Sequence, residues 1–165
     1  MDTALIKDLP LFTGLDEPQL RAVAAVLRAR RVSSGVPIFA EGETSSSLYI
    51  LTAGKVGTSK RMGLAAQRPD EPQRQKTLVR LVAPQFFGEM GLLSDLPRSA
   101  SITTEGDCEI FELTRADFDR LVAADALLGY RLVRNIAVVL AQRLRRTDLE
   151  LLKLTTALSL ALGNR

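Results

Sequence analysis

Residues 87–100 of this 165-residue chain read Phe87-Gly-Glu-Met-Gly-Leu-Leu-Ser-Asp-Leu-Pro-Arg-Ser-Ala100. Two glycines three residues apart, Gly88 and Gly91, permit a sharp backbone turn that residues with a side chain rarely adopt. A turn of this kind lets the N–H groups of Glu89, Met90 and Gly91 converge at the start of a short helix, where an anion binds favourably. The spacing therefore predicts an anion site, most simply for a phosphate.

The charged residues of this stretch define the chemistry further. Arg98 offers a planar guanidinium that pairs bidentately with phosphate, and the neighbouring Ser99 hydroxyl is another donor. The Glu89 carboxylate would repel a phosphate, so it is expected to accept hydrogen bonds from a neutral hydroxyl that points the other way. Glu89 and Arg98 together predict a sugar joined to a phosphate.

With these residues in this order, the stretch resembles the phosphate-binding cassette of cyclic nucleotide-binding domains. The resemblance extends over most of the chain, through Val36-Pro-Ile-Phe-Ala-Glu-Gly-Glu43, Leu48-Tyr-Ile-Leu-Thr-Ala-Gly-Lys-Val56 and Cys108-Glu-Ile-Phe-Glu-Leu-Thr-Arg-Ala-Asp-Phe118. It implies that Glu89 binds a ribose hydroxyl and that Arg98 binds the phosphate. It also implies a β-roll fold and a 3′,5′-cyclic nucleotide ligand.

Composition limits the class of protein. A chain of this length with 46% hydrophobic and 25% charged residues predicts one globular domain, and the 22 basic against 19 acidic residues indicate no strong nucleic-acid preference. Histidine is absent, which excludes Ser/His/Asp triads, Cys/His dyads and imidazole metal sites. We expect a non-enzyme without metal or cofactor. The unpaired Cys108 and the lack of a signal peptide or membrane span predict a cytoplasmic location.

Periodicity predicts an α+β fold. Apolar residues at helical spacing indicate a helix over residues 16–30 with Asp16 as its N-cap. Short alternating runs between glycine turns over residues 36–113 predict an antiparallel β-roll of the jelly-roll type. Residues 58–77 are polar and aperiodic, which indicates a long hairpin loop. Residues 1–125 would form the nucleotide-binding part of the domain.

The remaining 40 residues predict a second feature, a long helix from residue 126 to about residue 162. Thr114 caps a short helix that precedes it. From residue 140 onward, apolar positions recur in a seven-residue pattern at Leu140, Leu144, Thr147, Leu151, Leu154, Leu158 and Ala161. Such a pattern is typical of a coiled coil. We therefore predict a parallel homodimer through residues 140–161, with 126–165 as the dimerisation helix of the same domain.

Base recognition is implied by the resemblance alone. The segment Arg143-Leu-Arg-Arg-Thr-Asp148 resembles the dimer-helix stretch that contacts the purine in bacterial catabolite activator proteins, with Thr147 at the position of the threonine. Asp148 replaces the serine that follows there. Leu78 and Val79 lie on the strand that flanks the base in the family. We expect cAMP ahead of cGMP.

The sequence predicts a sensor that relays ligand occupancy through its C-terminal helix to a protein effector that the residues do not identify. These 165 residues leave no room for a recognition helix, so DNA is not an expected partner of this chain alone. No apolar stretch approaches the roughly 20 residues that span a bilayer, so a membrane is not an expected partner either. The chain is either a complete sensor or a fragment of a longer regulator. The alternative function is a dimerisation scaffold with a vestigial pocket, or one that binds another anion such as cyclic di-GMP.

Overall fold

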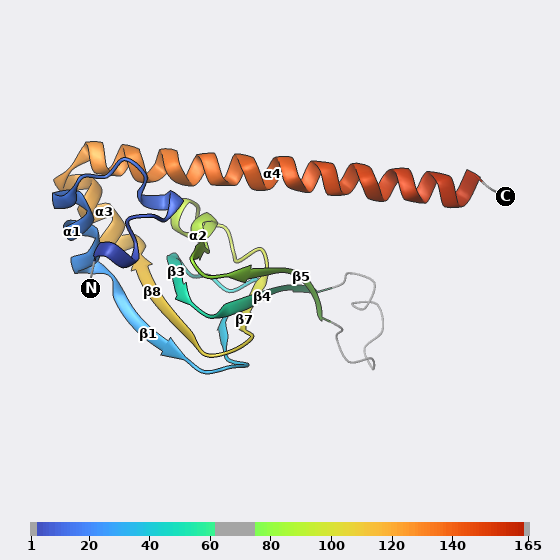
Figure 1. The fold of residues 1–165 in the computed structure, drawn as a ribbon, viewed down its shortest axis with the longest axis horizontal. Helices are drawn as coiled ribbons and strands as arrows, with labels where there is room; N and C mark the ends of the chain where they lie inside the picture. Colours follow the sequence, from blue (N-terminus) through green and yellow to red (C-terminus); the bar gives the residue numbers. More distant parts are fainter. Residues whose placement is uncertain (1–2, 62–74, 164–165) are drawn as a thin grey trace.

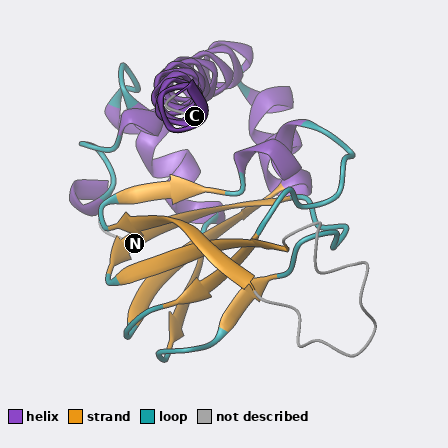
Figure 2. Cartoon of the chain, turned by 90° about the vertical axis from the view of Figure 1, so that its right-hand side faces the viewer, coloured by secondary structure: helices purple, strands orange, loops and turns teal. Residues whose placement is uncertain are grey.

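A computed structural model describes residues 3–61 and 75–163 of the chain. Helices gather on one side of the strands, and the long C-terminal helix is seen end-on at the top of this helical layer (Figure 2). The strands are β1 Arg28–Val32, β2 Pro37–Phe39, β3 Ser47–Ala53, β4 Lys55–Arg61, β5 Gln75–Val82, β6 Gln85–Phe87, β7 Ser101–Thr104 and β8 Cys108–Thr114. The helices are α1 Glu17–Val26, α2 Glu89–Leu93, α3 Arg115–Ala124 and α4 Ala126–Gly163, preceded by the short 3-10 turns η1 Thr3–Leu5 and η2 Pro10–Phe12.

Two four-stranded antiparallel sheets form the roll, in the orders β1-β8-β3-β6 and β2-β7-β4-β5. Strand β3 lies inside its sheet and is buried on both faces, so its side chains alternate between two cores. Leu48 and Ile50 face the helices, whereas Tyr49 and Leu51 face the interior of the roll. The predicted α+β fold with an antiparallel β-roll is confirmed.

The helical layer packs on the β1-β8-β3-β6 sheet. Its core joins η2, α1, α3 and the first three turns of α4, with Phe12, Val23, Phe118, Leu132 and Ile136 among its buried residues. Beyond this core, α4 runs past the other helices and its C-terminal part extends away from the rest of the described chain (Figure 1). Residues 126–163 form one continuous helix, which confirms the predicted long helix.

The first predicted helix is shorter than expected. Asp16 is its N-cap, as predicted, and forms a capping box with Gln19. The helix ends at Val26 rather than residue 30, because Leu27 is extended and residues 28–32 pair with β8 as an edge strand. Pairing with β8 is the non-local contact that overrides the helical propensity of this segment, and Arg30 and Arg31 add exposed ion pairs with acidic residues of the same strand.

The predicted loop over residues 58–77 is also partly wrong. Strand β4 continues to residue 61 and β5 begins at residue 75, and the two pair with each other along this part. The centre of the predicted loop, residues 62–74, lies outside the described residues. Cross-strand pairing therefore extends into a polar stretch in which the sequence shows no alternation.

Candidate functional site

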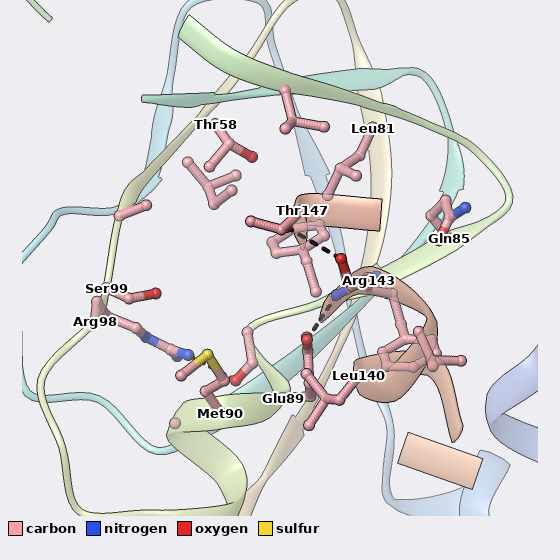
Figure 3. Close-up of a pocket in the computed structure, with 18 of the residues that line it drawn as sticks. Thr58, Leu81, Gln85, Glu89, Met90, Arg98, Ser99, Leu140, Arg143 and Thr147 are labelled. Atoms are coloured by element: carbon pink, nitrogen blue, oxygen red, sulfur yellow. Dashed lines mark hydrogen bonds and ion pairs between the residues drawn. The ribbon is translucent and has the colours of Figure 1, made fainter. Parts of the chain in front are cut away.

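A cavity of about 730 Å³ lies between the turn from β6 to α2, the β4–β5 hairpin and the middle of α4. Figure 3 shows Arg98, Ser99 and Met90 on one side of it, with Glu89 and Arg143 opposite and Thr147 between them and Thr58. The volume lies in the range typical of small-molecule sites. Residues far apart in sequence therefore converge at the predicted cassette.

The two glycines of the cassette make room for Arg98. Gly88 adopts a left-handed φ of 78°, which favours glycine, and caps the start of α2. A Cβ atom at Gly88 would lie 2.9 Å from Arg98 Nη1, and one at Gly91 would lie 2.6 Å from the same atom and 2.7 Å from the carbonyl oxygen of Ser45. Any side chain at Gly91 would therefore displace the guanidinium or the backbone beside it.

Three hydrogen bonds and a contact with an aromatic ring fix the Arg98 guanidinium. Only 5% of the residue is exposed, and it donates from Nε to Ser45 Oγ at 2.6 Å, from Nη1 to the Gly88 carbonyl oxygen at 2.8 Å and from Nη2 to the Ser47 carbonyl oxygen at 2.8 Å. Its guanidinium carbon lies 4.1 Å from the centre of the Phe39 ring. A guanidinium has five N–H groups, so these three bonds leave donors for a ligand.

Burial dominates the electrostatics around Arg98. Removal from water lowers the pKa of the guanidinium below its ordinary value, an effect that Tyr49 and nearby carboxylates oppose. Burial likewise raises the pKa of Tyr49, and Glu112 raises it further. Because an arginine stays charged in proteins, the floor of the cavity carries a fixed positive charge. A dianionic or monoanionic phosphate group is the ligand chemistry that matches it.

Glu89 forms an ion pair with α4. The residue is 4% exposed, and its Oε1 accepts from Arg143 Nη1 at 2.6 Å. Arg143 also donates from Nη2 to the Phe86 carbonyl oxygen at 2.8 Å and lies over the Phe86 ring at 5.3 Å. The predicted sugar-binding carboxylate is therefore clamped to the C-terminal helix.

Sequence reasoning did not single out Arg143. The only signal was its spacing, because it lies four residues before Thr147 and shares a helix face with it. The same face brings Arg146 and Glu150 to the cavity wall, where Arg146 Nε donates to Glu150 Oε1 at 3.2 Å. Thr147 lines the cavity too, and its Oγ1 donates to the Arg143 carbonyl oxygen at 3.1 Å.

Most of the predicted site residues meet at this cavity. Its lining includes Gly88, Glu89, Met90, Gly91, Arg98, Ser99, Val79 and Thr147. Leu78 is not among the lining residues and is 55% exposed. Leu78 is the extra residue of a β-bulge, because the consecutive residues Thr58 and Ser59 of β4 pair with Val79 and Thr77 and leave Leu78 without a partner opposite it.

Comparison with known proteins agrees with this geometry. The family model of the cyclic nucleotide-binding domain matches residues 29–125, which span the roll, the cassette and α3. The chain belongs to the cyclic nucleotide-binding domain family. The family resemblance predicted from the sequence is thereby confirmed, and the matched range includes every cassette residue described above.

Two curated relatives belong to bacterial regulators. The cyclic AMP receptor protein of Thermus thermophilus is 35% identical over 88% of this chain, and a CRP-like cAMP-activated global transcriptional regulator of Mycobacterium tuberculosis is 29% identical over 84%. The chain spans 62% and 56% of their lengths. The crystal structure of the Thermus thermophilus catabolite activator protein superposes with a TM-score of 0.73 at 32% identity, covering 88% of this chain and 63% of that one.

Residues 3–61 and 75–163 contain neither a membrane-spanning helix nor a cluster of metal-ligating side chains. None of the helices there is both long enough and apolar enough to cross a membrane. No group of three or more Cys, Asp or Glu side chains in these ranges is placed to hold a metal ion.

Proposed function

We propose that this cavity binds a 3′,5′-cyclic nucleotide and that the chain acts as a regulatory sensor of that ligand. The observation that carries the proposal is the placement of a buried guanidinium, Arg98, and a buried carboxylate, Glu89, on one cavity on either side of the Gly88 turn. The first matches a cyclic phosphate and the second matches the ribose 2′-hydroxyl beside it. Ser99 and the amides of Glu89 and Met90 complete the phosphate end.

Adenine is the base that we propose first. The two curated relatives carry cAMP or cyclic AMP in their names, and Thr147 lines the cavity beyond Arg143 with a hydroxyl that can donate or accept. Val79 and Leu81 add apolar wall on the strand side. Guanine is the alternative base. The alternative functions are binding of a cyclic dinucleotide and a dimerisation scaffold without a ligand.

The contact between Glu89 and Arg143 suggests how occupancy reaches α4. A ribose hydroxyl that donates to Glu89 changes the hydrogen bonding of the same carboxylate that holds Arg143. A ligand shifts a conformational equilibrium when it makes contacts that differ between the two states. We therefore propose that ligand binding alters how α4 sits on the roll.

We also propose a homodimer through residues 140–161. The seam residues Leu144, Leu151, Leu154 and Leu158 are between 59% and 69% exposed in the single chain. Leu144 also lines the cavity, and the C-terminal part of α4 extends beyond the helical layer (Figure 1). Leucines at the core positions of a heptad are stable in water when a second helix covers them.

Calorimetric titration with cAMP, cGMP and cyclic di-GMP tests the ligand. We expect saturable binding of a cyclic mononucleotide to the wild-type chain, and a loss of about a hundredfold in affinity for Arg98→Met, because the phosphate then lacks its charged donor. Arg80→Met is the matched control, since Arg80 pairs with Glu105 on the outer side of β5 and does not line the cavity.

Glu89→Gln provides a second test that does not depend on the structural bonds of Arg98. The substitution should weaken the binding of cAMP more than the binding of 2′-deoxy-cAMP, because only cAMP has the 2′-hydroxyl that donates a hydrogen bond to Glu89. Absence of binding by any cyclic nucleotide to the folded wild-type chain would refute the sensor and favour the scaffold. Binding of cyclic di-GMP alone would show that the ligand is a cyclic dinucleotide and not a cyclic mononucleotide.

A further inference from the structure

Helix α2, which carries the cassette, cannot hold its position by itself. It has five residues, from Glu89 to Leu93, whereas isolated helices need about 12 residues or more to be even marginally stable in water. Its final turn also leaves carbonyl groups without helical partners. The Met90 carbonyl oxygen is already satisfied, because it accepts from both the N–H of Ser94 at 2.9 Å and the Ser94 hydroxyl at 2.8 Å.

Arg115 satisfies two other carbonyls at this end. Its Nη2 donates to the Gly91 carbonyl oxygen at 3.0 Å and to the Ser94 carbonyl oxygen at 2.6 Å, and its Nη1 lies 3.0 Å from Asp95 Oδ1. Arg115 is the first residue of α3, and Thr114 caps that helix. A side chain fixed on one helix therefore anchors the carboxyl end of another, where a positive charge is favourable.

The backbone of Arg115 contacts the opposite wall of the Arg98 site. Its N–H donates to the Ser46 carbonyl oxygen at 3.0 Å. Ser46 lies between Ser45 and Ser47, whose oxygens accept from Nε and Nη2 of Arg98. Gly91 lies beside Nη1 of the same guanidinium. Arg115 thus ties together both segments that enclose Arg98.

The burial of Arg115 Nε is energetically unfavourable. Among the described residues, its Nε is buried and has no hydrogen-bond partner. An unsatisfied buried donor is unfavourable, so the contacts of the other two guanidinium nitrogens must offset this cost. The three oxygens on α2 and the following loop hold it where it is.

We propose that Arg115 is a positioning residue for nucleotide binding, which fixes α2 and the Ser45–Ser47 segment around Arg98 although it does not line the cavity itself. This inference rests on the proposed function and adds a residue outside the cassette to it. Its consequence is that the affinity of the folded protein, and not only its stability, depends on Arg115, because misplacement of the cassette reduces every phosphate contact together.

Arg115→Met and Arg115→Lys test the inference in parallel calorimetric titrations, with Arg120→Met as the matched control. Arg120 lies on the same helix, is largely exposed and pairs with Asp117 away from the cavity. We expect Arg115→Met to raise the Kd for cAMP and for cGMP by the same factor, about tenfold or more. Lysine keeps the positive charge but has only one nitrogen, so it cannot replace both Nη2 on the two carbonyls and Nη1 on Asp95, and the Kd of Arg115→Lys should lie between those of the wild type and Arg115→Met.

The fitted stoichiometry separates positioning from stability. If Arg115 were needed only for folding, its substitution would lower the fitted number of binding sites and the melting temperature. The molecules that remain folded would then keep the wild-type Kd. Unchanged Kd values in Arg115→Lys or Arg115→Met overturn the inference while leaving the sensor intact. A wild-type chain that binds no cyclic nucleotide overturns both, and if Arg115→Met does not fold, the Kd of Arg115→Lys decides alone.

Discussion

Replacing Arg143 by methionine tests the contact between α4 and the cassette. The substitution removes the ion pair to Glu89 at 2.6 Å and the bond to the Phe86 carbonyl oxygen at 2.8 Å, while the apolar length of the side chain is kept. What remains is a carboxylate whose side chain is 6% exposed and whose cationic partner is gone. The ligand-free protein should therefore be destabilised.

The magnitude follows from the burial of the two partners. Breaking a fully buried ion pair costs about 3–5 kcal/mol, because one charge stays buried without compensation. The Arg143 side chain is 35% exposed, so water already screens part of the interaction and replaces part of what is lost. We expect a loss of about 2 kcal/mol in the free energy of unfolding for Arg143→Met.

Urea unfolding at one fixed protein concentration measures this loss, because a dimer would make stability depend on concentration. A double-mutant cycle with Glu89→Gln isolates the pair: the neutral amide removes the stranded charge, so Arg143→Met should cost much less in the Glu89→Gln background. A loss below about 0.5 kcal/mol in Arg143→Met, or equal losses in both backgrounds, would refute the reasoning.

Two other predictions address the dimer and acid stability. Leu151→Asp places a charge on the proposed seam and should convert the dimer to a monomer in size-exclusion chromatography with light scattering, whereas Leu149→Asp, equally exposed but off the seam, should stay dimeric; a monomeric wild-type chain contradicts this. Hydrogen bonding by Thr114 and then Arg120 lowers the pKa of Asp117, so its contribution is present at neutral pH and is lost as the pH falls below about 4. The decline in unfolding free energy between pH 6 and 2 should be smaller in Asp117→Asn, and an unchanged decline would contradict this.

The fold and the cassette were predictable because the informative residues are close in sequence. The Gly88 turn and the charge at Arg98 lie within eleven residues, and the conformational freedom of glycine and the chemistry of a guanidinium do not depend on distant parts of the chain. The caps at Asp16 and Thr114 are local for the same reason, and both form as predicted.

Contacts between distant segments were not predictable in this way. That Glu89 meets Arg143, 54 residues later, depends on the path of α4 across the roll. The end of the first helix at Val26 depends on pairing with β8 some 80 residues later, because only that partner makes an arginine-rich segment favourable as a strand. A single sequence contains the residues for such contacts without their geometry.

Three arginines contact α2 and fix the position of this short helix. Arg98 donates to the Gly88 carbonyl at its start, Arg143 pairs with the Glu89 side chain, and Arg115 binds the Gly91 carbonyl at its end. Each arginine comes from a different element: the segment before β7, α4 and α3. A helix without its own stability takes the position that these contacts define, so the proposed ligand, by competing for Arg98 and Glu89, would change the balance among all three arginines. Under the proposed function, coupling between a ligand and α4 would require no path through the core of the roll, because α2 would contact the ligand and already contacts α4 through the ion pair of Glu89 with Arg143.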